Sequence, residues 1–228
     1  MLGRLVIQTR IVLIDLHERG CRVAPRDPQQ ERRTLLAMSG WVTAGTIGLT
    51  WAGCWLGDVS LWPQLMVSWL TLIAGLVLAL PLLVTFFVLK ALPFEPLRRV
   101  FRIVHEYFGP AMARCRFAEL AFVAIGAGVS EELLFRGLLP AVLANRGTLI
   151  ALIAPNVLFG ILHAATITYA VIASCIGLFF SLCLTIWPET NLVTVIVAHA
   201  VYDFVAFVVV AREGRHNVRH QDASTGTD

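Results

Sequence analysis

The stretch Ala118-Glu-Leu-Ala-Phe-Val-Ala-Ile-Gly-Ala-Gly-Val-Ser-Glu131-Glu132-Leu-Leu-Phe-Arg136-Gly-Leu-Leu139 decides the fold class of this chain. Its composition is that of a membrane-spanning helix, except that Glu131 and Glu132 stand side by side and Arg136 follows four residues later. A carboxylate near the centre of a bilayer costs about 3 kcal/mol on insertion scales. Charged residues in such a segment therefore usually face a protein interior or a water-filled cavity, where they mark a functional site.

The composition of the whole chain agrees with a membrane protein. Of its 228 residues, 57% are hydrophobic and only 14% are charged, whereas a soluble domain is about 25% charged. We predict an all-α, polytopic integral membrane bundle of about six transmembrane helices, because runs of low polarity approach or exceed the ~20 residues that cross a bilayer. The predicted spans are 35–57, 65–89, 117–141, 149–170, 171–187 and 191–211. The fifth is the shortest, and the turn before it is placed near Tyr169.

The distribution of basic residues predicts the orientation. Most lysines and arginines lie in the segments 1–34 and 90–116 and in the tail 212–228, and the loops 58–64 and 188–190 have none. The positive-inside rule then places both termini in the cytoplasm. The Arg-rich composition favours a prokaryotic inner (plasma) membrane. No basic patch is interleaved with aromatic residues, so no nucleic-acid partner is expected.

The chain divides into three parts. Residues 1–34 form a cytoplasmic N-terminal segment that is a candidate for an amphipathic helix on the inner membrane surface, as is the segment 92–110. Residues 35–211 form the membrane-embedded bundle. Residues 212–228 form a polar C-terminal tail with the composition of a disordered segment.

Few ionisable residues remain inside the predicted spans once the helix ends are set aside, and all of them lie in the C-terminal half. They are Glu131, Glu132, Arg136, His163, His199 and Asp203. Each has a structural explanation if it is taken alone, since a lone buried histidine is more often a core residue than a catalytic one. Their combination on three helices indicates a site.

Helical spacing relates these residues to one another. Glu132 and Arg136 are four apart and can pair, as can His199 and Asp203. Glu131 is rotated by about 100° from Glu132 and need not share its partner. A rise of about 1.5 Å per residue brings the residues on the three helices to similar depths, so one convergent site is possible.

Three motifs in this order resemble a known family. They are Glu131-Glu132-x-x-x-Arg136, Phe159-x-x-x-His163 and His199-x-x-x-Asp203. Together they resemble the CPBP family of intramembrane proteases, which includes the type II CAAX prenyl endopeptidases and bacterial relatives proposed to process bacteriocins or to give immunity to them. The resemblance covers residues 117–207.

The resemblance implies an endopeptidase that hydrolyses a peptide bond within the membrane. Glu131 would activate the attacking water with the help of His163, and His199 would stabilise the oxyanion together with residue 203. Glu132 would belong to the same centre, with Arg136 and Phe159 in support. The substrate would be a membrane protein or a lipidated peptide: a CAAX-type protein, a leader or a sorting tail.

Two features leave the chemistry open. Asp203 stands where better-known family members carry asparagine, and an ionised aspartate cannot donate a hydrogen bond to an oxyanion. It must be protonated, orient the His199 ring or bind a metal. Glu131, His163 and His199 could also supply a zinc site of two histidines and one glutamate. We prefer a metal-free, glutamate-activated water, and zinc stays the alternative cofactor.

Two other functions are compatible with the same residues. The carboxylates and imidazoles could form the relay of a proton- or ion-coupled transporter, although the sequence shows no inverted repeat. The chain could also be a non-enzymatic membrane protein, such as a bacteriocin-immunity factor built on the family scaffold.

Overall fold

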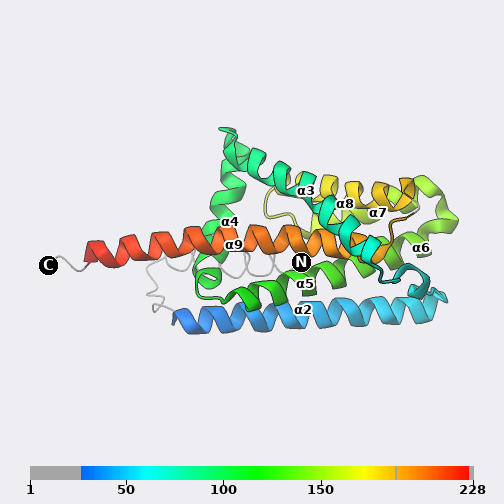
Figure 1. The fold of residues 1–228 in the computed structure, drawn as a ribbon, viewed down its shortest axis with the longest axis horizontal. Coiled ribbons are helices and arrows are strands. Elements are labelled where there is room, and N and C mark those ends of the chain that lie inside the picture. The colour runs from blue at the N-terminus through cyan, green and yellow to red at the C-terminus, as the bar shows by residue number, and fades with distance from the viewer. Residues whose placement is uncertain (1–26, 188, 226–228) are drawn as a thin grey trace, which may run out of the picture.

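The computed structural model describes residues 27–187 and 189–225, and the regular elements within them are helical (Figure 1). The segment 1–26, with most of the expected N-terminal amphipathic helix, lies outside the described residues. The long helices are α2 (Pro28–Gly57), α3 (Trp69–Ala91), α4 (Glu95–Ala113), α5 (Phe117–Glu132), α7 (Thr148–Leu162), α8 (Ile167–Ile186) and α9 (Leu192–Thr225). A π-helical segment η2 (Leu133–Leu138) and the short helix α6 (Leu139–Leu143) continue α5.

Local sequence signals set the helix ends. Asp27 caps α2 by accepting a hydrogen bond from the Gln29 N–H at 3.0 Å. Ser68 and Thr71 form a reciprocal capping box at the start of α3. Thr166 caps α8 by accepting from the Tyr169 N–H. Each cap satisfies a backbone donor that the first helical turn leaves free.

Helix α9 is the central element of the bundle. It packs against α3, α4 and α5, while α7 packs against α8 and α2 packs against α5. Figure 1 shows α2, α5 and α9 running along the length of the molecule, with α4 crossing their direction. The motif-bearing helices α5, α7 and α9 therefore belong to one packed body.

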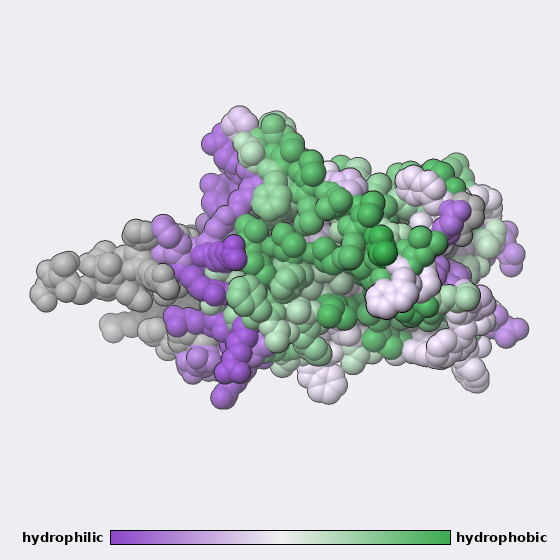
Figure 2. Space-filling model, in the orientation of Figure 1, coloured by the Kyte–Doolittle hydropathy of each residue, from purple (hydrophilic) through white to green (hydrophobic). Residues whose placement is uncertain are grey.

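Among the residues that the structure describes, three helices are long and apolar enough to cross a membrane: α3, α8, and α9 over Leu192–His216. Helix α7 is apolar but has only 15 residues. Figure 2 shows a broad hydrophobic band between a hydrophilic end and an opposite end of mixed polarity. These features indicate an integral membrane protein.

The break between the predicted fourth and fifth spans was misplaced. The structure ends α7 at Leu162 and begins α8 at Ile167, so the turn precedes Tyr169 and the fifth helix is the longer of the two. The run is uniformly apolar, so hydropathy could not locate a turn that is fixed by the Thr166 cap. Helix α9 extends to Thr225, past residue 212 where the predicted polar tail begins.

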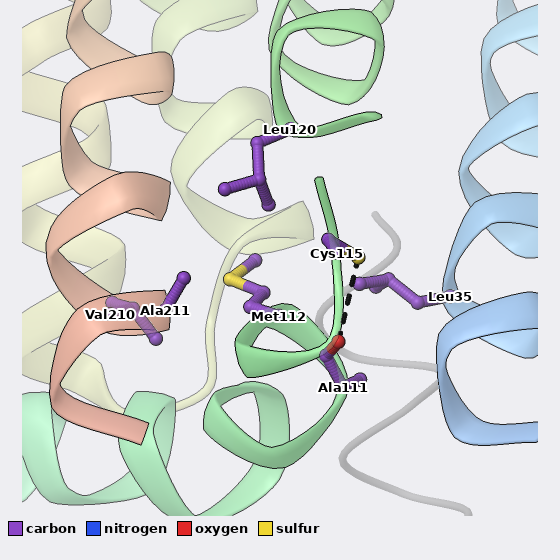
Figure 3. Close-up of a cluster of buried hydrophobic side chains, with 7 residues drawn as sticks. All are labelled: Leu35, Ala111, Met112, Cys115, Leu120, Val210 and Ala211. Atoms are coloured by element: carbon purple, nitrogen blue, oxygen red, sulfur yellow. Dashed lines mark hydrogen bonds between the residues drawn. The ribbon is translucent and has the colours of Figure 1, made fainter. Parts of the chain in front are cut away.

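Helix α4 is amphipathic, as expected for the segment 92–110. Arg98 and Arg102 lie beside Glu95 on its exposed side. Its buried face joins a hydrophobic cluster in which α2, α4, α5 and α9 meet (Figure 3). The cluster comprises Leu35, Ala111, Met112, Cys115, Leu120, Val210 and Ala211. Two ion-pair contacts, Arg32 with Glu119 and Lys90 with Glu213, tie the helices together near this end.

Candidate active site

The two glutamates lie where the regular α-helix ends. Helix α5 stops at Glu132, and the six residues Leu133–Leu138 form a π-helical turn that carries Arg136. The sequence predicted a helix through 117–141 without this irregularity. π-Helical turns inside α-helices are rare and occur often at functional sites.

Glu132 is completely buried and pairs as the sequence predicted. Its Oε1 accepts a hydrogen bond from Arg136 Nη1 at 3.0 Å. The same oxygen lies 2.6 Å from His199 Nδ1, which reaches it from α9. Because a carboxylate can only accept, the Nδ1 of His199 carries the proton.

Arg136 is held by more than its glutamate partner. Its guanidinium carbon lies 4.5 Å from the centre of the Phe159 ring and 5.6 Å from that of Phe180. Its Nη2 donates to Oδ1 of the buried Asn156 at 3.4 Å. Such ring and hydrogen-bond contacts stabilise a cation that has left water.

Glu131 faces a different environment from its neighbour. Its side chain is 16% exposed, and Oε2 lies 3.7 Å from His163 Nε2 and 3.9 Å from His199 Nε2. These separations are too long for direct hydrogen bonds, but one water molecule can bridge groups so placed. The structure therefore brings together Glu131, His163 and His199, which the sequence analysis placed on three different helices.

His163 is the C-cap residue that directly follows α7. Its Nδ1 lies 2.8 Å from the Phe159 carbonyl oxygen. That oxygen can only accept, so Nδ1 is the protonated nitrogen, and Nε2 of the neutral ring is an acceptor directed towards Glu131. Phe159 packs against the same imidazole, with the ring centres 4.2 Å apart. This contact is consistent with the supporting role expected for Phe159.

Asp203 lies beside His199, one turn along α9. Its Oδ2 is 3.5 Å from His199 Nε2. Both nitrogens of the His199 ring therefore face carboxylate oxygens, and the ring stacks on Phe180. Of the three roles expected for Asp203, this position is consistent with the second, in which Asp203 orients the His199 ring.

The side chains in their present positions do not form a zinc site. Ligands about 2.0–2.1 Å from a tetrahedral zinc ion lie roughly 3.4 Å from one another, and both Glu131–imidazole separations are longer. Within the described part of the chain, no three His, Cys, Asp or Glu side chains form a group that could hold a metal ion. We therefore derive no step through a metal.

The sequence missed Asn156, Phe180 and Ser181, which surround Arg136 or extend its contacts. Asn156 Nδ2 donates to Ser181 Oγ at 2.9 Å. Asn156 and Ser181 carry no charge, so the pattern of ionisable residues inside the spans does not reveal them. A polar Asn156 amid the apolar residues 149–158 was the available signal.

The fold and this centre define a helical integral membrane protein with carboxylates and imidazoles gathered from three helices. Residues 114–205 match the family described as type II CAAX prenyl endopeptidase Rce1-like. This part of the chain is a domain of that family, and the resemblance inferred from the three motifs is confirmed. The family is one of peptide-bond hydrolases, as predicted. Neither the search of curated proteins nor that of solved structures gave a match.

Proposed function

We propose that this chain is an intramembrane endopeptidase that cleaves a membrane-associated protein substrate with a water activated by Glu131. The observation that carries the proposal is the convergence of His163 Nε2 and His199 Nε2 on one carboxylate oxygen of Glu131. The family domain over residues 114–205 supports peptide-bond hydrolysis as the reaction.

In the first step, Glu131 takes a proton from a water molecule whose oxygen attacks the scissile carbonyl carbon. His163 helps to hold this water, because its Nδ1–H is engaged by the Phe159 carbonyl and its Nε2 is left as an acceptor. General-base catalysis by a positioned side chain contributes about 10²–10⁴-fold. Glu131 is suited to this role because it is partly exposed, whereas Glu132 is fully buried.

In the second step, His199 stabilises the oxyanion of the tetrahedral intermediate. We assign it the doubly protonated form, with Nδ1–H donating to Glu132 and Nε2–H held between Asp203 and the oxyanion. The carbon–nitrogen bond then breaks, and the proton on Glu131 passes to the leaving amine. Glu132 cannot touch a substrate because it has no exposed surface, so it acts by positioning His199.

The length of α7 supports access from the cytoplasmic side. Its 15 residues span about 22 Å, which is short of the ~30 Å hydrocarbon core. In a six-span topology with both termini inside, its C-terminal end at His163 faces the cytoplasm. Non-helical backbone at membrane depth is tolerated where it lines a water-filled cavity. The turn at 163–166 would let water and a substrate segment reach Glu131 from that side.

The substrate class is a membrane protein or a lipidated peptide, consistent with a site between membrane helices. The test compares peptide termini in membranes from cells that carry the wild-type protein, Glu131→Gln or Glu95→Gln. The last is a matched control, because Glu95 is an exposed glutamate on α4. We expect substrate-derived termini with wild type and with Glu95→Gln, and none with Glu131→Gln at equal protein level.

Cleavage at the wild-type rate by Glu131→Gln would rule out Glu131 as the base. Ion flux into proteoliposomes that depends on Glu131, without any change in peptide termini, would instead identify a transporter. A chelator added to the cleavage reaction tests the zinc alternative: unchanged activity agrees with glutamate-activated water, and loss of activity restored by zinc contradicts it.

A further inference from the structure

A chain of buried polar contacts continues beyond the residues proposed for the chemistry. Ser181 on α8 contacts Asn156 on α7, Asn156 contacts Arg136, Arg136 contacts Glu132, and Glu132 contacts His199. All five side chains are at most 8% exposed. Polar groups out of reach of water are costly to bury and must be paired. A connected series of five such side chains therefore indicates a role beyond packing.

The partners of Asn156 fix the orientation of its amide. Nδ2 lies 2.7 Å from the carbonyl oxygen of Leu152 and 2.9 Å from Ser181 Oγ. The Leu152 carbonyl can only accept, so the NH₂ group must face it. The amide oxygen then faces Arg136, whose guanidinium can only donate. Asn156 is thus set as an acceptor for Arg136.

Arg136 has little room to leave this position. The Phe159 and Phe180 rings lie close to its guanidinium. On α8, a Cβ added to Gly177 would lie 2.4 Å from Arg136 Nη2 and 2.7 Å from Asn156 Oδ1. Any side chain at position 177 would displace the contact between Arg136 and Asn156, so the glycine makes room for it.

We propose that Asn156, braced by Ser181, is a positioning residue for the proteolytic centre. Its amide oxygen accepts a hydrogen bond from Arg136 Nη2, and Arg136 Nη1 in turn donates to Glu132. Glu132 then holds His199 with Nδ1 protonated and Nε2 directed at the site. This inference rests on the proposed function. It adds that α7 and α8 set the orientation of the histidine on α9 through the intervening side chains of Arg136 and Glu132.

The first test is kinetic and uses the purified full-length protein with a prenylated CAAX-type peptide as the probe. Asn156→Leu removes the amide at similar volume, and Val157→Ala is the matched control on the exposed side of α7. We expect Asn156→Leu to lower kcat by up to about 100-fold with KM within about twofold, because small displacements of catalytic groups carry costs of this size. Ser181→Ala should cost less, because the Leu152 carbonyl still holds the amide.

Gly177→Ala is a complementary probe, because it removes no polar group and acts only by pushing on Arg136 and Asn156. It should lower kcat as Asn156→Leu does. Its control is Cys175→Ala, an exposed position on the same helix, which should behave like wild type. Wild-type kcat in both Asn156→Leu and Gly177→Ala would overturn the inference.

The second test does not depend on activity. In ¹⁵N-histidine-labelled protein, the two ring nitrogens of His199, assigned by comparison with His199→Gln, report which nitrogens carry protons. We expect both ring nitrogens to be protonated in wild type and Val157→Ala, and loss of the Nδ1 proton in Asn156→Leu, because Glu132 no longer holds it. An unchanged His199 signal in folded Asn156→Leu would contradict the inference. If wild type does not cleave the probe, that substrate assignment fails, and the histidine signals alone decide the role of Asn156.

Discussion

At the scale of single residues, the site depends on two neighbouring glutamates that have opposite environments. Glu132 is sealed in the bundle between Arg136 and His199, and Glu131 borders the space between His163 and His199. The angular step of a helix turns adjacent side chains apart by about 100°. One carboxylate can therefore organise the centre while the other remains able to exchange a proton with water.

Asp203 gives the first residue-scale prediction. We expect Asp203→Asn to retain more activity than Asp203→Leu. The amide oxygen of asparagine can still accept from His199 Nε2, and its NH₂ group can donate to the oxyanion, whereas leucine can do neither. Initial rates of peptide cleavage by the two purified variants at neutral pH measure the difference. Equal loss in both variants would show that the negative charge itself is required.

At the scale of elements, the sequence indicated the helices and the residues that face one another but not their irregularities. The i, i+4 spacing correctly predicted the contacts of Glu132 with Arg136 and of Asp203 with His199, because that spacing fixes which side chains share a face. The π-helical turn after Glu132 and the end of α7 at Leu162 were missed. The π-helical turn depends on tertiary packing that residue spacing does not reveal, and the end of α7 depends on a turn that is fixed by the Thr166 cap.

Close helix crossings also depend on packing, and Gly75 provides a test. A Cβ at Gly75 on α3 would lie 2.7 Å from the Thr194 carbonyl oxygen and 2.7 Å from Val197 Cβ on α9. Gly75→Ala should therefore destabilise the protein by about 1–3 kcal/mol, the usual cost of overpacking. Gly45 on α2 has no heavy atom within 4 Å of its added Cβ, so Gly45→Ala should be neutral or stabilise by up to about 1 kcal/mol.

Thermal unfolding of both variants in the same detergent checks this prediction. The expected order of unfolding temperature is Gly75→Ala below wild type, and Gly45→Ala at or above it. An unchanged unfolding temperature for Gly75→Ala would mean that α3 and α9 can separate at this crossing without cost.

At the scale of the whole molecule, three features indicate how the bundle sits in a membrane. Exposed tryptophans occur on α2 and in the segment that follows it, and such residues favour the membrane interface. The basic residues gather near the opposite ends of the same helices. A hydrophobic surface band lies between the two ends (Figure 2). These features support our proposal that both termini lie in the cytoplasm.

Accessibility of single cysteines tests that topology. In a variant whose five native cysteines are replaced by alanine, we would introduce Asp58→Cys, Glu189→Cys or Arg102→Cys, all at exposed positions between the proposed spans. A membrane-impermeant maleimide added to intact spheroplasts should label positions 58 and 189, because six spans with both ends inside place these loops outside. Position 102 should react only after the membrane is opened, since α4 would lie on the cytoplasmic side. Labelling of position 102 in intact spheroplasts would show that the orientation is opposite to the one proposed. Protection of position 58 or 189 would show that the chain has fewer than six spans.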